Sequence, residues 1–537
     1  MSEVYANILT SLTTGLYIQV NIAIREYLQN AYDAIKSAKL QGLPEPIGGF
    51  RVEVKVTKDH RIVTISDNGI GMSRVLLEEY TSIGGGTKNS PDFAGHKGIG
   101  KLAGLRFFKN FVVRTKEAGI QKGYELHWRS GDMMKVLLSE PGKMKKIPYN
   151  NFIRDYYEIR DFQEPNAELH FTQVQLVDAM DEFKEQINEN KIGEFILVNC
   201  PVPFLPNAFE PAEEIEKFLG TGFIPIITYI NEKVIYQPYR DNLNLAPPRL
   251  EEIRYGDHIR AKGWFSWVKN SAEGLGEEKI RGLRFRCKGL CVGDRNLFAN
   301  NCMPEGRSQF ADWFTGEICV LDDIIRPNTA RDGFEKSEAV RYFYNELKKR
   351  LGKKLSSLAD VRSEIHAAEQ HLAKVAKLIA ENKTSIQSEL MRLAERSKNL
   401  QRKRDSDEFN INFSVINKIE ELLKSREKIL VKETDTAKDE LKEALDDGNT
   451  GEILKKLIEL KAKEVQSSSK DTKKEISSLI DKTIKEVIKK DLVKPPKDIL
   501  SPQEEIVLKI LIEYLNLKQI AYVKKEVKDF VRQALKS

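Results

Sequence analysis

The chain has 537 residues, of which 41% are hydrophobic and 31% are charged. That length accommodates about two to four domains with substantial cores. No apolar stretch approaches the roughly 20 residues of a membrane-spanning helix, and the N-terminus lacks the basic and then apolar segments of a signal peptide. These features exclude an integral helical membrane protein and predict a soluble, cytoplasmic protein. The five cysteines are sparse and irregularly spaced, so they are interpreted as core thiols and not as a zinc site.

The formal charge of +6 is unevenly distributed. Residues 351–537 hold 39 Lys and Arg against 33 Asp and Glu, so residues 1–350 are balanced. This excess falls well short of a dedicated nucleic-acid-binding arm. The balanced charge of residues 1–350 argues mildly against a DNA channel through that part of the chain.

The first predicted element that carries candidate functional side chains is a helix over Ile24–Ala34, with the sequence IREYLQNAYDA. Glu26, Asn30 and Asp33 are spaced so that a helix places them on one stripe, beside an apolar flank. Burying two carboxylates and an amide together costs free energy unless a polar ligand, such as hydrated Mg²⁺ with a phosphate, binds to them. An ordinary amphipathic helix is the alternative interpretation of this stripe alone.

Two strands are predicted next, over Phe50–Val56 and Ile62–Ser66, followed by the turn Asp67-Asn-Gly-Ile-Gly-Met72 and a helix over Arg74–Tyr80. A glycine-rich stretch, Thr81–Gly104, then leads into a short helix over Leu102–Phe107. Such a loop offers backbone N–H groups to phosphate oxygens and can close over a bound ligand. A simple turn and a flexible surface loop are the alternatives.

In this order and rough spacing, the three motifs resemble those of the GHKL ATPases. That superfamily includes the ninety-kilodalton heat-shock chaperones, gyrase B, MutL, the MORC proteins and the histidine kinases. The resemblance rests on the E-x-x-x-N-x-x-D-A helix, the D-x-G-x-G turn and the G-x-x-G-x-G-K end of the loop, at Gly95–Lys101. It implies a Bergerat-type α/β sandwich at residues 1–177 that binds ATP and Mg²⁺.

The resemblance also implies individual roles. Glu26 would be the general base, Asn30 the Mg²⁺ ligand, and Asp67 the acceptor for the adenine amino group, with Met72 lining the adenine pocket. The other residues expected to bind nucleotide are Asp33, Gly69, Gly71, Gly84, Thr87, Lys88, Gly95, His96, Lys97, Gly98, Ile99, Gly100 and Lys101.

The sequence departs from the family at the last strand of the sheet. Strands are predicted over Phe111–Arg114, Gly123–Arg129, Met134–Leu138 and Leu169–Val177. The family commonly begins the last strand with a Gly-Thr pair whose threonine binds phosphate. Here Asn166-Ala167 stands at that place and Thr172 lies further in, so no threonine contact is assigned.

A second domain, residues 178–350, resembles the α/β transducer-type middle domain of the chaperones and MORC proteins. Its predicted strands include Phe223–Asn231, with further strand-like segments at residues 263–269 and 282–293. The segment Asn328-x-x-Arg331-Asp332 implies an arginine that reaches the γ-phosphate and stabilises the charge of phosphoryl transfer. The alternative is a structural loop in which Asn328 caps a helix and Asp323 pairs with Arg326.

The remaining chain is predicted to be helical. Helices are expected over residues 340–351, 359–403, 413–444 and 452–490, forming an arm over 351–494 as a coiled coil or antiparallel hairpins, with a small helical unit at 495–537. Residues 461–497 carry 11 lysines against 6 acidic residues. They are either a solvated face or a surface for duplex DNA or RNA. The whole chain is therefore predicted to be α+β.

By resemblance, the expected function is that of a Mg²⁺-dependent ATPase acting as an ATP-gated dimeric clamp. Its partner would be a protein client or effector subunit, or duplex DNA bound by the lysine-rich helices, as in MutL- or MORC-like clamps. Bacterial relatives of this type occur in antiviral defence systems. A nucleotide-binding scaffold with little hydrolysis is the weaker alternative. A histidine kinase is disfavoured because no phospho-acceptor helix precedes the ATPase motifs, and a topoisomerase because no cleavage-domain tyrosine context or acidic metal cluster is found.

Overall fold

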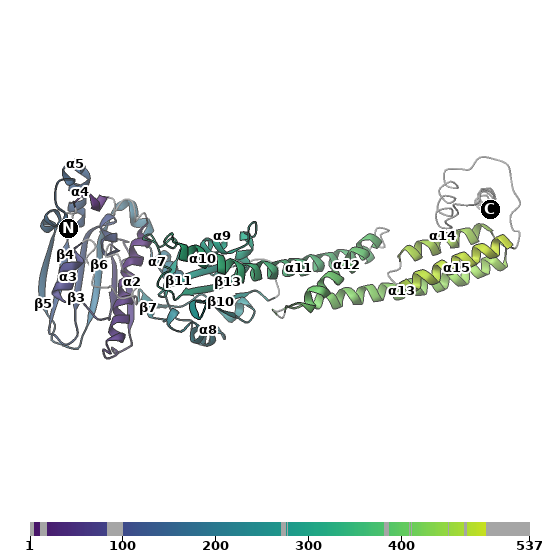
Figure 1. The fold of residues 1–537 in the computed structure, drawn as a ribbon, viewed down its shortest axis with the longest axis horizontal. Helices are drawn as coiled ribbons and strands as arrows, with labels where there is room; N and C mark the ends of the chain where they lie inside the picture. Colours follow the sequence, from purple (N-terminus) through teal and green to yellow (C-terminus); the bar gives the residue numbers. More distant parts are fainter. Residues whose placement is uncertain are drawn as a thin grey trace. The chain divides into compact units, whose positions relative to one another are not determined.

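The computed structural model describes residues 5–10, 19–82, 100–269, 275–276, 278–380, 386–407, 409, 411–448, 450–466 and 470–489. The chain divides into two compact units, Met1–Asp360 and Val361–Ser537 (Figure 1). The predicted start of the helical arm at residue 351 therefore lies within the first unit. No helix in the described part of the chain has both the length and the apolar composition needed to cross a bilayer.

The first unit contains an eight-stranded sheet with the order β5-β4-β3-β6-β2-β1-β7-β8. Neighbouring strands are antiparallel, except that β1 and β7 are parallel. Along β1 the valines alternate with polar residues and are buried, as expected for a strand with one face on the core. The strands are β1 Arg51–Val56, β2 Val63–Asp67, β3 Phe108–Lys116, β4 Lys122–Trp128, β5 Tyr157–Gln163, β6 Phe171–Ala179, β7 Ile227–Ile230 and β8 Lys233–Ile235.

Three features of this sheet differ from the sequence prediction. The predicted strand Met134–Leu138 is wrong, because it lies within helix α4, Ser130–Ser139, whose Met133, Met134 and Leu137 are buried at helical spacing. A short apolar run does not distinguish a strand from a buried helix. Strand β5 was not predicted, and β7 and β8 extend the first sheet beyond the predicted boundary at residue 177.

Helices cover this sheet. The longest, α2 (Val20–Leu40), contacts β1, β2 and a 3₁₀ turn over Gly100–Arg106 that replaces the predicted short helix after the glycine-rich loop. The predicted helix Arg74–Tyr80 is confirmed as α3, where the Ser73 side chain caps the N-terminus by accepting from Leu76 N–H. The other helices are α1 Ile8–Thr10, α5 Pro141–Met144, α6 Tyr149–Ile153 and α7 Glu189–Asn199.

A second, five-stranded sheet has the order β12-β11-β13-β10-β9. Here β11 and β13 are parallel and the other pairs are antiparallel. Its core includes Trp264 packed edge-on against Tyr239, with ring centroids 5.0 Å apart. The elements are β9 Arg249–Tyr255, β10 His258–Trp267, β11 Gly282–Cys287, β12 Leu290–Val292 and β13 Phe314–Val320, with helices α8 Ala212–Leu219, α9 Arg295–Cys302 and α10 Glu338–Leu347.

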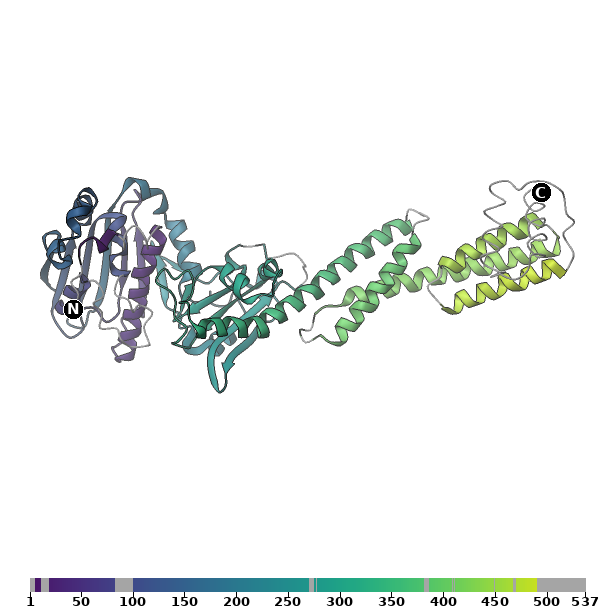
Figure 2. The same cartoon turned by 45° about the horizontal axis from the view of Figure 1, so that its top comes forward.

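Helices α11 (Lys353–Ala380), α12 (Ile386–Asp405), α13 (Ser414–Asp446), α14 (Thr450–Gln466) and α15 (Lys470–Lys489) follow. The prediction of one long helix over residues 359–403 is wrong, because α11 and α12 fold back on each other. An ion pair joins Lys403 to Glu364 at 2.9 Å and a hydrogen bond joins His371 to Glu389 at 2.7 Å, which requires antiparallel helices. Helices α13, α14 and α15 also pack side by side (Figure 2). The predicted unit at 495–537 lies outside the described residues.

Candidate functional site

The predicted polar stripe forms on α2. Apolar residues pin the opposite flank of the helix: Ile24, Tyr27, Leu28, Ala31 and Ile35 are all buried. Asp33 is buried, while Glu26 and Asn30 are partly buried. The helix thus holds Glu26 and Asn30 at the margin between core and solvent, where each can meet a ligand, with Asp33 buried beside them.

Glu26 is enclosed by two arginines and a glycine. Its Oε1 lies 3.5 Å from Arg25 Nη2. A Cβ added at Gly100 would lie 3.1 Å from Glu26 Cδ and overlap its Oε2, so the end of the glycine-rich loop rests on this carboxylate. Burial raises the pKa of Glu26, while the charges of Arg25 and Arg331 act in the opposite direction. A buried carboxyl group with a raised pKa and cationic neighbours is typical of a general base.

Asp67 closes β2 and is buried. Its Oδ1 accepts a 2.9 Å hydrogen bond from Gly69 N–H, which fixes the carboxylate at the start of the turn. The two glycines after it are required by the packing of the chain itself. A Cβ at Gly69 would lie 2.6 Å from Ile35 N, and one at Gly71, where φ is +73°, would overlap the carbonyl oxygen of Lys116.

Two hydroxyl groups to which no sequence motif assigns a role, those of Thr172 and Thr115, lie beside this turn. The β2–β6 register places Thr172 directly opposite Asp67. Thr172 Oγ1 is 3.1 Å from Thr115 Oγ1, which also accepts a 2.9 Å hydrogen bond from Met72 N–H. Only the strand pairing brings these groups together, so no local motif could have indicated them.

Ala167, at the position usual for the phosphate-binding threonine, lies in the turn before β6. Its carbonyl oxygen accepts hydrogen bonds from Gly119 N–H at 2.8 Å and Lys116 Nζ at 2.9 Å. The remaining loop residues predicted to bind nucleotide, Gly84, Thr87, Lys88, Gly95, His96, Lys97, Gly98 and Ile99, lie outside the described residues. Lys101 begins the 3₁₀ turn with Gly100, and only its backbone is described.

Arg331 lies in the loop between β13 and α10, and its side chain contacts α2. Its Nη1 donates a 2.9 Å hydrogen bond to Gln29 Oε1, and Arg25 Nη2 donates one of 2.8 Å to Ala330 O. Arg331 is buried and its charge acts on Glu26. The structure therefore brings the predicted arginine to the polar stripe of the first sheet's helix.

The alternative interpretation of this segment is wrong in its details. Asn328 donates to Asp332 Oδ1 at 2.6 Å and caps no helix in the described chain. Arg326 Nε donates to the backbone oxygen of Asp323 at 2.9 Å, while the Asp323 carboxylate pairs with Lys288 at 3.2 Å. The loop is thus organised by a different set of contacts.

The donor set around α2 suits Mg²⁺ carried in by a nucleotide. In the described ranges no three His, Cys, Asp or Glu side chains gather as a metal cluster. Asn30 offers an amide oxygen one helical turn from Glu26. Mg²⁺ commonly takes only one or two protein ligands and completes its shell with phosphate and water, so the residues present fit this ion. All five cysteines are free and buried, as predicted for core thiols.

A family model for histidine kinase-, DNA gyrase B-, and HSP90-like ATPase matches residues 18–147. Chaperone protein HtpG of Alkalilimnicola ehrlichii is 32% identical over 134 residues, covering 22% of this chain and 21% of the relative. HtpG of Acinetobacter baylyi is 28% identical over 144 residues, covering 24% and 22%. HtpG of Fusobacterium nucleatum is 29% identical over 199 residues, covering 28% and 32%.

The matched stretch includes the α2 stripe, the turn after Asp67 and the glycine-rich loop. Residues 18–147 therefore form an ATPase domain of the GHKL superfamily, as the sequence motifs predicted. The α+β fold class, with a mixed α/β ATPase core and a helical C-terminal region, is confirmed. The chain spans about a fifth to a third of the length of the curated relatives it matches.

Proposed function

We propose that this protein is a Mg²⁺-dependent ATP hydrolase of the HSP90-like type. The observation that carries the proposal is the Glu26 carboxylate, buried beneath Gly100 and flanked by Arg25 and Arg331. The match of residues 18–147 to the HSP90-like ATPase family supports it.

Each residue of the site has a defined task in this proposal. Asp67 accepts the adenine amino group through its carboxylate, which the hydrogen bond from Gly69 N–H holds in place, with Thr172 alongside. Asn30 presents its amide oxygen to Mg²⁺, which when bound offsets the negative charge of the phosphates. Glu26 orients the attacking water and takes its proton, and its raised pKa suits a base that works near neutral pH.

Arg331 stabilises the charge that develops on the transferred phosphoryl group, because a guanidinium is always charged and binds phosphate oxygens in pairs. The segment that carries Arg331 follows the second sheet, so hydrolysis is coupled to the contact between this segment and α2. We propose that this coupling drives a dimeric clamp that opens and closes around a client protein or an effector subunit. Bacterial antiviral defence is one setting in which such a partner would be an effector.

Steady-state ATP turnover and retention of bound nucleotide test the proposal in the parent and in Glu26→Ala. The parent should hydrolyse ATP slowly, and Glu26→Ala should bind ATP without turning it over. Hydrolysis by Glu26→Ala at the parental rate would overturn the proposed mechanism. Equal nucleotide binding in both proteins serves as the control for an intact site.

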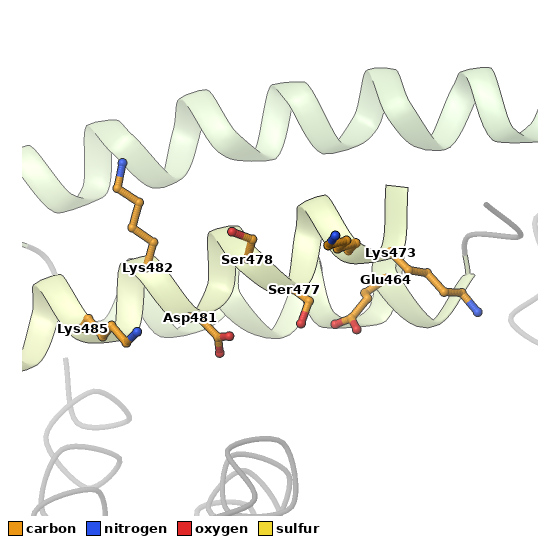
Figure 3. Close-up of a pocket in the computed structure, with 8 residues that line it drawn as sticks. Glu464, Lys473, Ser477, Ser478, Asp481, Lys482 and Lys485 are labelled. Carbon is orange, nitrogen blue, oxygen red and sulfur yellow. The ribbon is translucent and has the colours of Figure 1, made fainter. Parts of the chain in front are cut away.

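A second candidate function, the engagement of duplex DNA, has support from one groove of the second unit (Figure 3). The groove has a volume of about 680 Å³ and is lined by Glu464, Lys473, Lys474, Ser477, Ser478, Asp481, Lys482 and Lys485. Within the described chain, none of its four lysines, all on α15, forms an ion pair, whereas Lys438 on α13 and Lys456 on α14 do. The four lysines outnumber the two carboxylates of the groove, and lysines with hydroxyl groups suit a phosphate backbone.

Adding duplex DNA to the ATP turnover assay distinguishes a clamp that acts on DNA from one that acts on a protein client. A DNA-engaging clamp should be stimulated by DNA and lose both binding and stimulation in Lys474→Gln/Lys482→Gln. The matched control is Lys442→Gln/Lys455→Gln, which removes the same charge from exposed positions outside the groove. Turnover that depends on Glu26 but is indifferent to DNA favours a protein client, and the nucleotide-trapped Glu26→Ala protein then serves to capture it.

A further inference from the structure

Gln29 makes a buried contact that the ATPase motifs do not require. It occupies a variable position of the E-x-x-x-N helix, between Glu26 and Asn30. Its side chain is 4% exposed and that of Arg331 is 5% exposed, and their hydrogen bond of 2.9 Å joins residues far apart in the chain. A buried amide that accepts from a buried guanidinium fixes the position of both groups, because losing the bond would leave a buried donor unsatisfied.

The backbone around Arg331 is fixed as well. Arg331 has a φ of +53°, a left-handed conformation that costs energy for a residue with a side chain and persists only where the surroundings impose it. Arg331 N–H donates to Asn328 O at 3.1 Å, and Arg331 O accepts from Gly293 N–H at 2.7 Å. Asn328 N–H donates to Gly333 O at 2.9 Å. The loop therefore presents the arginine from a constrained turn.

Two further contacts limit how the loop meets α2. Arg331 Nη2 donates to Cys287 O at 3.4 Å, at the end of β11. Arg25 Nη2 donates to Ala330 O at 2.8 Å, from the α2 side. On α2, Gln29 thus binds the guanidinium itself, and Arg25 binds the adjacent backbone.

We propose that Gln29 is a positioning residue, which holds the Arg331 guanidinium beside Glu26 before nucleotide binds. The inference rests on the proposed function, since it assigns Arg331 a role in ATP hydrolysis. A group that is already oriented needs no reorganisation when charge develops, and this is the main source of electrostatic catalysis.

The chemistry of glutamine explains why this residue suits the task. Its amide oxygen accepts a hydrogen bond without carrying charge, so Arg331 keeps its full positive charge for the phosphates. A glutamate would bind the same guanidinium but neutralise it and place a negative charge close to ATP. A methionine has a similar length but offers only a weak acceptor, so it would remove this anchor of the guanidinium on α2.

These differences define the experiment. Gln29→Met should lower kcat about 10- to 100-fold with little change in KM for ATP, because transition-state contacts are lost and ground-state binding is kept. Adding Gln29→Met to Arg331→Ala should cause no further loss, because Gln29 acts through Arg331. Gln237→Met is the matched control, since Gln237 is an equally buried glutamine outside the site.

Hydrogen exchange of residues 327–334 in the nucleotide-free protein gives a second readout that does not depend on turnover. Exchange should be faster in Gln29→Met than in the parent or Gln237→Met, and should remain protected in Gln29→Glu, which nevertheless turns over slowly. Unchanged exchange and kcat in Gln29→Met would overturn the inference. If Arg331→Ala hydrolyses ATP at the parental rate, the positioning role also fails. A parent without ATPase activity would refute the proposed function, while the exchange data would still decide whether Gln29 anchors the loop.

Discussion

Arg286 and Glu317 form an ion pair in the interior of the second sheet, with Nη2 2.6 Å from Oε1 and side chains that are 1% and 3% exposed. Arg286 also donates to the carbonyl oxygens of Val198 at 3.2 Å and Cys200 at 3.3 Å, at the C-terminal end of α7. One cation thus satisfies a buried carboxylate and the open end of a helix. Along the chain, α7 lies between β6 and β7, which both belong to the first sheet, so this contact ties the second sheet to a helix of the first.

Replacing Arg286 with methionine should destabilise the protein by about 3–5 kcal/mol, because Glu317 would be left as an uncompensated buried charge. The double variant Arg286→Met/Glu317→Met should recover part of this loss. Urea unfolding of the parent, the single and the double variants measures the effect. A single variant as stable as the parent would contradict the assignment of this pair as an essential element of the core.

The burial of Glu26 predicts a pH dependence of stability. Its pKa is raised above the ordinary value of 4.5 in the folded protein, so the folded state binds the proton more tightly than the unfolded state. This contribution is fully present below 4.5 and is lost as the pH rises through the folded-state pKa. Glu26→Gln should therefore be more stable than the parent at neutral pH, with the difference shrinking in acid. Thermal unfolding of both proteins across this pH range is the measurement.

Asp67→Asn should weaken ATP binding at least tenfold while the turn stays folded. The asparagine Oδ1 can still accept from Gly69 N–H, but its NH₂ group would face the adenine amino group as a second donor. Calorimetric titration with ATP measures binding, and an unchanged melting temperature shows that the fold is kept. Wild-type affinity in this variant would exclude Asp67 as the adenine acceptor.

Gly100→Ala should impair hydrolysis more than binding. The added methyl group would overlap Glu26 Oε2, so the carboxylate must move from its place or the loop end must rise. A displacement of about 1 Å is enough to cost roughly 100-fold in rate. Gly142→Ala is the control, because no atom lies within 4 Å of the added Cβ. Single-turnover kinetics at saturating ATP distinguish a slower chemical step from weaker binding.

Local patterns in the sequence were sufficient for part of this structure. The α2 stripe follows from residue spacing, and the helix predicted over Arg74–Tyr80 after the turn is α3. The motifs also identified the ATPase class. Strand β5 was missed because its sequence, YEIRDFQ, lies at the sheet edge with no continuous buried face.

Contacts between distant residues could not be predicted in the same way. Thr172 meets Asp67 only through the register of β2 with β6, which a sequence pattern fixes poorly when both strands are polar on one face. Gln29 lies on α2 and Arg331 lies in the loop between β13 and α10, far away in the chain. No local signal marks a glutamine as the partner of a remote arginine. The specific chemistry of the site therefore depends on tertiary pairing.

The parallel pairing of β7 with β1 has a practical consequence for fragments of this protein. A fragment that ends at residue 177 would leave one side of β1 without its neighbour, although β1 lies inside the sheet of the intact chain. Unpaired N–H and C=O groups along a valine-rich strand are a template for intermolecular association. A soluble, isolated nucleotide-binding fragment would have to include the hairpin that ends at Ile235, so its natural boundary lies well beyond the last residue of the family match.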